Sequence, residues 1–495
     1  TQKRRYHGNT FENNLHHKTC HLRIISMTTD SFWFIIFFGE KIRFPVNSFN
    51  DYITGDYMNE KQDLTVGSIP QKIIYLSMPI LATSFINMAY NFIDMICIGR
   101  LGSGAVAAVG SAGFLMWFAQ ASSSIARIGA QITISQSMGR KDLDMARQYA
   151  QASMWLNSFI AWAFTIFIMI FNEQIIGYFR LGDPQIIMQG RIYLVIVGLA
   201  MVFAYTTPVL SAMFNASGDS KTPFLFNTCG LIFNIVFDIL LIFGIGPFPK
   251  LGVAGAAIAT AGAQALVWLL FILHIKKYPQ PHLNIRIFSR PDFAKIKEIA
   301  KIGFPSSLQS TLYCVFSIML ARIISHFGAT EIAVQKVGSQ IESLSWITAD
   351  GFAIALCAFV GQNFGSRNFD RIDKGIRIIA MMSIFLGAIA TIGLVFFGEP
   401  IFRVLIDEPQ SIPSGVNYLR ILGYSQIPMC IEIITIGMFN GFGETKIPAV
   451  ISILLTGARI PMALFFTSTA LGVNGVWWAI SLSSIVKGSI LPVFY

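Results

Sequence analysis

Two aspartates lie inside long apolar stretches of the sequence, where a carboxylate is costly enough to be a functional candidate. Asp94 lies in NMAYNFIDMICIG and Asp238 lies in FNIVFDILLIFG. Tyr90 precedes Asp94 by four residues and Asn234 precedes Asp238 by four, so each polar pair shares one face of a helix. Such a carboxylate pair can be neutralised in turn by a proton, a sodium ion or a cationic substrate, which is the physical requirement for exchange.

The two carboxylates are expected at one depth. A rise of about 1.5 Å per helical residue places Asp94 and Asp238 roughly 8–12 Å inside the outer boundary of their segments, and Thr260 reaches a similar level. A Na+ ion would find four side chains there: Asp94, Asn234, Asp238 and Thr260. The alternative is that the aspartates pair with basic residues at the membrane surface, which the short Asp side chain disfavours.

The elements that position these residues are expected to be membrane-spanning helices. Of the 495 residues, 54% are hydrophobic and 13% are charged, and the mean hydropathy is +0.60, whereas a soluble domain carries about 25% charged residues. A helix of about 20 apolar residues crosses the hydrocarbon layer. We predict an all-α polytopic membrane protein with about twelve spans: 69–98, 105–138, 147–171, 188–213, 222–245, 252–275, 302–325, 340–364, 375–397, 414–440, 447–467 and 471–495.

The net charge of +10 does not indicate a nucleic-acid partner, because Lys and Arg form no single face or stripe. They concentrate in the loops that follow the even-numbered segments, so the positive-inside rule places these loops and both termini in the cytoplasm. We expect a multi-pass protein of the plasma membrane that works as a monomer.

Residues 1–66 differ from the rest of the chain in being polar, and they contain four histidines. Met58 precedes a short polar lead of the kind that starts such proteins. We expect an extension that is disordered or, in residues 1–57, lies upstream of the native start, with incidental histidines. The remainder is predicted to form a six-helix lobe at 67–277, a cytoplasmic loop at 278–301 and a second six-helix lobe at 302–495.

An internal repeat relates the two predicted lobes. SQSMG at 135–139 matches GQNFG at 361–365, and MFNASGDSKTP at 213–223 matches MFNGFGETKIP at 438–448, at offsets of 226 and 225 residues. Because each unit has an even number of crossings, we expect parallel repeats with a substrate cavity between the two bundles.

The repeat is broken at the candidate site. The counterparts of Tyr90, Asp94, Asn234 and Asp238 in the second half are, in that order, Phe316, Leu320, Arg459 and Ala463. Because neither aspartate is retained, we expect ion coupling in the first lobe alone.

Four further residues allow two interpretations each. Glu432 and Asp350 are acids that could line a second-lobe cavity or pair with a basic residue on another helix. Arg127 could bridge two helices or line the pore. Pro79 could be a hinge in the first helix, or a proline that the membrane helix tolerates without moving.

Taken together, these features resemble the multidrug and toxic compound extrusion (MATE) family, over roughly residues 68–495. The resemblance rests on NFIDMICIGRLGSGAVAAVG, GAQITISQSMGRKD, the paired MFNxxG[DE][ST]KxP motifs and GVAGAAIATAGAQ, in this order. The set of Asp94, Asn234, Asp238 and Thr260, with Tyr90 and Pro79, is similar to the cation site of the DinF-like branch. Tyr313 stands where other branches carry an acid in the seventh helix.

The resemblance implies a secondary active antiporter, without a cofactor, that exchanges H+ or Na+ for lipophilic organic cations or drugs by alternating access. It also implies that the first helix bends at Pro79 when an aspartate changes protonation. The alternative is a flippase for a lipid-linked precursor or oligosaccharide, for which four arginines could supply the positive charge that a pyrophosphate needs: Arg127, Arg322, Arg420 and Arg459. An enzyme is disfavoured, because after residue 66 the three histidines lie near segment ends.

Overall fold

The computed structural model describes residues 63–179, 182–285, 290–403, 408–409 and 411–495. Most of the predicted N-terminal extension therefore lies outside the described residues. The first half of the described chain folds into α3 (Ile69–Gly99), α4 (Ser103–Gly139), α5 (Leu143–Tyr178), α6 (Pro184–Leu199), α7 (Met201–Ala216), α8 (Lys221–Phe243) and α9 (Val253–Lys277).

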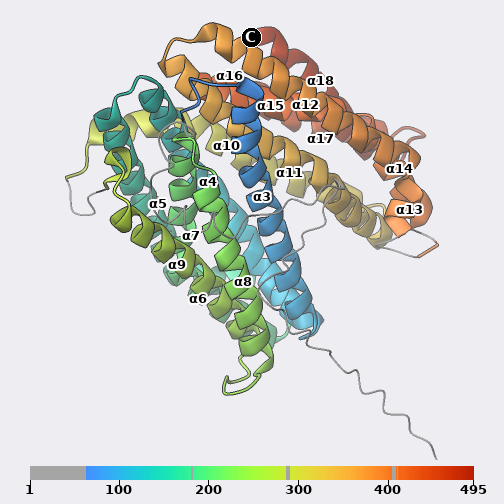
Figure 1. The fold of residues 1–495 in the computed structure, drawn as a ribbon. Coiled ribbons are helices and arrows are strands. Elements are labelled where there is room, and N and C mark those ends of the chain that lie inside the picture. Colours follow the sequence, from blue (N-terminus) through green and yellow to red (C-terminus); the bar gives the residue numbers. More distant parts are fainter. Residues whose placement is uncertain (1–62, 180–181, 286–289, 404–407, 410) are drawn as a thin grey trace, which may run out of the picture. The chain divides into compact units, whose positions relative to one another are not determined.

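The second half follows the same order of long helices (Figure 1). It comprises η1 (Pro281–Leu283), α10 (Phe293–Ser325), α11 (Ala329–Gly365), α12 (Phe369–Phe396), α13 (Gly398–Arg403), α14 (Ile412–Gly423), α15 (Gln426–Phe442), α16 (Lys446–Gly457), α17 (Arg459–Thr467), α18 (Asn474–Ile490) and η2 (Leu491–Phe494). We call α3–α9 lobe 1 and α10–α18 lobe 2.

Within the described residues, ten helical stretches are long and apolar enough to cross a membrane. Two bent pairs, α6–α7 at 49° and α14–α15 at 51°, raise this number to twelve when each pair counts as one span. The prediction of an all-α protein with about twelve spans is confirmed. The two bent pairs are the fourth and tenth spans, which the repeat makes equivalent.

One predicted boundary is wrong, because α10 begins inside the predicted loop 278–301. Asp292 caps this helix, since its Oδ1 accepts hydrogen bonds from the backbone N–H groups of Ala294 at 3.0 Å and Lys295 at 3.2 Å. A capping aspartate satisfies N–H groups that a helix start would otherwise leave without partners. Residues 293–301 are therefore helical, and their Ala, Lys and Glu residues favour a helix.

The repeat is visible in backbone geometry as well as in sequence. The helices α4 and α11 both have 37 residues, and the glycines before them, Gly102 and Gly328, share φ 109° and ψ 168°. The residues Lys141 and Arg367, which follow these helices, share a φ of 59°. This left-handed conformation is uncommon for residues other than glycine. Its presence at both positions shows that the two repeats contain the same turn.

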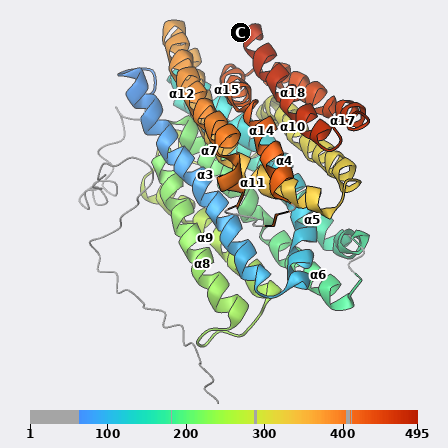
Figure 2. The same ribbon diagram turned by 90° about the vertical axis from the view of Figure 1, so that its right-hand side faces the viewer.

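The helix α3, which the sequence assigns to the first lobe at 67–277, packs on both lobes. Its first half places Leu76 and Ile80 in an apolar core with Phe359 of α11, whereas Ile98 near its other end lies in a lobe 1 core. Figure 2 shows α3 running between α8 and α12. One helix thus joins the cores of the two lobes.

The lobes are joined at the end of the bundle where α4, α7, α11 and α15 finish. We call it the basic end, because its turns carry Arg140, Lys141, Lys221, Arg367 and Lys446. Gln136 Nε2 donates to the carbonyl of Gly441 at 3.0 Å, and Gln362 Nε2 donates to the carbonyl of Ala216 at 2.8 Å. The repeat makes these two bonds equivalent.

Glycines let the two lobes approach at this junction. A Cβ added to Gly139 would lie 1.8 Å from the Gln362 carbonyl oxygen, and one added to Gly365 would lie 2.1 Å from that of Gln136. The paired SQSMG and GQNFG motifs are therefore explained by close backbone contact between α4 and α11.

Candidate functional site

Three helices bring the predicted coupling residues together in lobe 1. Tyr90 and Asp94 come from α3, Asn234 and Asp238 from α8, and Thr260 from α9. The helix α8 packs against both α3 and α9 (Figure 1). Asn234 and Asp238 are completely buried, and Tyr90, Asp94 and Thr260 are partly buried. We call these five residues the coupling cluster.

The hairpin between α8 and α9 fixes the position of Asp238 relative to Thr260. The helix α8 ends at Gly244, which has a left-handed φ of 72°, and Leu251 N–H donates to the Leu241 carbonyl at 2.9 Å. A Cβ added to Gly255 would lie 2.6 Å from that same carbonyl oxygen. Glycine at 255 therefore allows the two helices to lie in contact just outside the site.

The coupling cluster leaves polar atoms without partners. Seven buried side-chain atoms of these five residues have no hydrogen bond: Tyr90 OH, Asp94 Oδ1, Asn234 Oδ1 and Nδ2, Asp238 Oδ1 and Oδ2, and Thr260 Oγ1. Asp94 and Asp238 are the only carboxylates with such atoms in the part of the chain that the structure describes. A buried polar atom without a partner costs about 1–3 kcal/mol. This cluster is therefore suited to bind a proton or another ligand that supplies the missing partners.

The charges in the coupling cluster act on one another. Asp94 and Asp238 interact electrostatically, and Tyr90 interacts with both. Asn234 lies beside Asp238 and Thr260 lies beside Tyr90, although neither contact reaches hydrogen-bond geometry. Two like charges in one buried site favour occupation by a cation, because a proton or metal ion removes their repulsion.

The structure adds Tyr193 to this group. This tyrosine of α6 is 7% exposed and interacts electrostatically with Asp94, Tyr90 and Asp238. Composition gave no reason to select it, because it lies in the apolar run RIYLVIVGL. The repeat could have revealed it, since an offset of 225 residues pairs Tyr193 with Tyr418, and each is followed by leucine.

The donor set suits a proton or a hard monovalent cation. Carboxylate, amide and hydroxyl oxygens are ligands that hard cations prefer, and the coupling cluster supplies all three kinds. Among the described residues, no group of three or more His, Cys, Asp or Glu side chains could hold a metal ion. The coupling cluster contains no His or Cys, the side chains that transition metals prefer as ligands.

Pro79 lies inside α3, within the stretch that places Leu76 and Ile80 in the lobe 2 core. The helix continues through it, and its carbonyl accepts a hydrogen bond from Thr83 Oγ1 at 2.9 Å. The bending of α3 at Pro79 stays a prediction.

The second-lobe acids lie in different environments. Glu432 is buried and its Oε1 lies 2.7 Å from Lys487 Nζ, so it pairs with another helix. Asp350 is exposed and interacts electrostatically with Arg127 of lobe 1. Arg127 therefore faces an acid across the two lobes. The sequence did not single out Lys487 or its pairing with Glu432.

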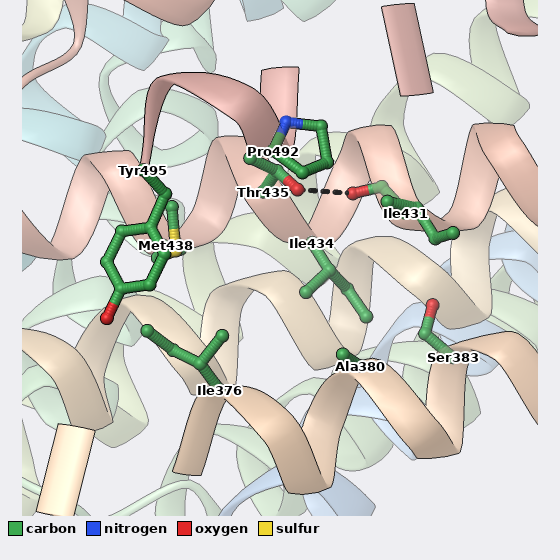
Figure 3. Close-up of a pocket in the computed structure, with 9 residues that line it drawn as sticks. All are labelled: Ile376, Ala380, Ser383, Ile431, Ile434, Thr435, Met438, Pro492 and Tyr495. Carbon is green, nitrogen blue, oxygen red and sulfur yellow. Dashed lines mark hydrogen bonds between the residues drawn. The ribbon is translucent and has the colours of Figure 1, made fainter. Parts of the chain in front are cut away.

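A small cavity of about 120 Å³ lies in lobe 2, between α12, α15 and η2 (Figure 3). Its lining is almost entirely apolar, and the Thr435 hydroxyl donates to the carbonyl of Ile431 at 2.8 Å instead of facing a ligand. It contains none of the coupling cluster. We therefore place the candidate site at the coupling cluster and not at this cavity.

Comparisons with known proteins agree with the two-lobed architecture. The family model MatE matches residues 79–240 and 305–465, once in each lobe and over more than half of the chain. The chain is 27% identical over 438 residues to the "Probable multidrug resistance protein NorM" of Thermotoga maritima, covering 87% of this chain and 93% of that protein.

Two further similarities bear on substrate and fold. The chain is 25% identical over 445 residues to the "FAD transporter" of Shewanella oneidensis, covering 87% of this chain and 95% of that protein. A solved structure described as the outward-facing conformation of a multidrug resistance MATE family transporter of the MOP superfamily has a TM-score of 0.82. It is 21% identical, over 88% of this chain and 97% of that one.

Proposed function

Because the chain belongs to the MATE family of multidrug efflux transporters, we propose that it exports lipophilic organic cations in exchange for H+ or Na+. The coupling ion binds at the coupling cluster of lobe 1. The observation that carries this proposal is the pair of carboxylates Asp94 and Asp238, in which three buried oxygens have no hydrogen-bond partner: Asp94 Oδ1, Asp238 Oδ1 and Asp238 Oδ2.

The residues of the coupling cluster have distinct roles in the proposed exchange. Asp94 and Asp238 carry the negative charge that the ion neutralises, and Asn234 and Thr260 contribute neutral oxygens. Tyr90 contributes its hydroxyl group on the face of α3 that also carries Asp94. Neutralising the pair removes the repulsion between Asp94 on α3 and Asp238 on α8, so the ion changes the energy of the contact between these helices.

Exchange also requires that the lobes open alternately at the two ends of the bundle. The basic end is closed by the reciprocal bonds of Gln136 and Gln362. We place the basic end in the cytoplasm from the positive-inside rule, so this conformation is closed on the cytoplasmic side. An ion entering from outside then favours the change that opens the basic end.

Three classes of substrate are compared for this transporter: organic cations, anions such as FAD, and lipid pyrophosphates. Homologues named for multidrug resistance favour organic cations, and the homologue named as an FAD transporter makes an anionic cargo the natural comparison. A flippase for lipid pyrophosphates has less support. Arg459, one of its four candidate arginines, is buried and donates to Ser483 Oγ at 2.7 Å and Ser484 Oγ at 3.0 Å.

Reconstituted protein tests the proposed function. Proteoliposomes are loaded with a lipophilic cationic dye such as ethidium, or with FAD, and efflux is followed under an inward H+ or Na+ gradient. We expect gradient-driven efflux of the dye by the wild type and by Asp144→Asn, whose side chain is 82% exposed in a surface ion pair, and none by Asp94→Asn. Equal dye efflux by Asp94→Asn, at matched protein levels, contradicts the proposal.

A further inference from the structure

Lobe 2 contains a buried group of charged side chains that the proposed coupling does not use. Glu432 and Lys487 form an ion pair at 2.7 Å, and their side chains are 7% and 6% exposed. Arg459 is buried beside them and interacts electrostatically with Lys487 and with Glu342 of α11. Glu342 also accepts a hydrogen bond from Gln426 Nε2 at 3.3 Å. We call Glu342, Glu432, Arg459 and Lys487 the lobe 2 charge group.

One member of the lobe 2 charge group, Arg459, stands at a position equivalent to a member of the coupling cluster. The repeat pairs Asn234 of α8 with Arg459 of α17, and it pairs α9 with α18. Arg459 donates hydrogen bonds to serines of α18. Tyr418, the counterpart of Tyr193, is 2% exposed and interacts electrostatically with Glu342 and Arg459. Each lobe thus turns an equivalent tyrosine toward its own ionisable group.

The two groups differ in how their charges are balanced. The coupling cluster has two carboxylates and no basic side chain, and three of its four carboxylate oxygens are buried without a hydrogen-bond partner. The lobe 2 charge group has two acids and two bases, so it is neutral without any added ion. At the positions equivalent to Asp94 and Asp238, lobe 2 has the buried apolar residues Leu320 and Ala463.

We propose that the lobe 2 charge group is an ion site with resident cations, in which the Lys487 ammonium and the Arg459 guanidinium take the place of a mobile monovalent cation. Lobe 2 is then neutral in every step of the cycle, and coupling ions bind in lobe 1 alone. The inference rests on the proposed function for the role of lobe 1, but it concerns the chemistry of lobe 2 itself.

The proposal predicts that removing the tethered cation creates a new ion site. In Lys487→Met the carboxylate of Glu432 stays buried without its partner, and a buried charge without a partner must be neutralised or the fold loses stability. A proton or Na+ from solution can then take the place of the ammonium group. In the double variant Glu432→Gln/Lys487→Met neither charge remains, so no ion is needed.

Cation-dependent thermal stability of purified protein tests this without transport. The Tm is measured in NaCl and in choline chloride, at pH values from 5 to 9. The background is Asp94→Asn/Asp238→Asn, which removes both carboxylates of the coupling cluster so that lobe 1 no longer binds an ion. We expect the background to show no saturable Na+ dependence. Adding Lys487→Met should produce a rise in Tm of several degrees with Na+ or with acid, and Glu432→Gln/Lys487→Met should abolish that rise.

Two results would overturn the proposal. One is a Lys487→Met protein whose Tm responds to cations no more than its background does. The other is a background protein that keeps a saturable cation dependence which Glu432→Gln/Lys487→Met removes, because native lobe 2 would then bind a mobile ion. If Lys487→Met fails to fold, the cation dependence of Tm in the background protein and in Glu432→Gln/Lys487→Met still tests the proposal. A wild-type Tm whose cation dependence survives Asp94→Asn/Asp238→Asn and both lobe 2 changes contradicts the proposed function and leaves this inference intact.

Discussion

At the scale of single residues, the distinguishing property of the coupling cluster is unmet hydrogen-bonding capacity. Asp219, another buried acid of lobe 1, differs from Asp238 in this respect. Its Oδ1 accepts from Thr222 N–H at 3.1 Å and its Oδ2 accepts from the Thr222 hydroxyl at 2.7 Å. The two aspartates therefore predict opposite effects of the same substitution.

We expect Asp238→Asn to raise the free energy of unfolding by about 1–3 kcal/mol in Na+-free buffer at pH 9, because it removes an uncompensated buried charge. Asp219→Asn should lower it, because a charge-assisted cap is lost. Thermal unfolding in choline chloride measures both. A fall in Tm for Asp238→Asn as large as that for Asp219→Asn would show that Asp238 is satisfied in the native state.

A second residue-scale prediction concerns His282, in η1 between the lobes and outside the spans. Burial lowers the pKa of His282 to about 4, whereas an unfolded histidine titrates near 6.5. Below about pH 6.5 the unfolded state takes up the proton first, so stability is full above that pH and is lost as the pH falls toward 4. The expected loss between pH 7.5 and pH 5 is roughly 2 kcal/mol.

His282→Leu should reduce the loss of stability at acid pH, because leucine has no group that takes up a proton when the protein unfolds. His326→Leu, at an exposed histidine after α10, is the matched control and should leave the pH dependence of Tm unchanged. Identical pH profiles for the wild type and His282→Leu would contradict the assignment.

At the scale of elements, α3 and the segment before it connect the two lobes. Leu64 is completely buried in a core that is mostly lobe 2, and its N–H donates to Gln362 Oε1 at 3.0 Å. The Arg371 guanidinium donates to the carbonyls of Leu64 at 3.0 Å, Gly67 at 2.7 Å and Val66 at 3.0 Å. We call these three hydrogen bonds of Arg371 the clasp; they connect the segment before α3 to α12.

We expect Arg371→Met to release residues 63–67 and to cost about 3 kcal/mol, because three hydrogen bonds from a charged group are lost. Arg371→Lys should recover little, since an ammonium group lacks the planar fork. Hydrogen exchange of the peptide at 63–70 measures the release. Lys374→Met, at an exposed residue of the same helix, is the control, and equal exchange in Arg371→Met and Lys374→Met would contradict the clasp.

The sequence predicted the spans and the five residues of the coupling cluster, because apolar length, four-residue spacing and helical rise are local properties. It did not predict Tyr193, Glu342 or Lys487, because their roles depend on which helices meet in space. It also assigned α3 to one lobe, although Leu76 and Ile98 lie in different cores. The repeat was the most informative pattern in the sequence, because its exceptions mark the coupling cluster and Arg459 of the lobe 2 charge group.

At the scale of the whole molecule, the basic end is closed by backbone contact between two glycine motifs. We expect Gly139→Ala to weaken this closure, because the added Cβ would lie 1.8 Å from the Gln362 carbonyl oxygen, and overpacking of this kind typically costs about 1–3 kcal/mol. Spin-label distances between α4 and α11 at the basic end should lengthen. Gly110→Ala, on the same helix with nothing within 4 Å of the added Cβ, should leave them unchanged, and unchanged distances in both variants would contradict the closure.

The central claim is that Asp94 and Asp238 couple an inward ion to an outward cargo. The most direct measurement records ion influx and dye efflux together in the same proteoliposomes, with a trapped pH indicator or radioactive Na+. The account predicts influx that accompanies efflux in the wild type, and neither flux in Asp94→Asn/Asp238→Asn. Coupled fluxes in the double variant at the wild-type ratio would contradict it.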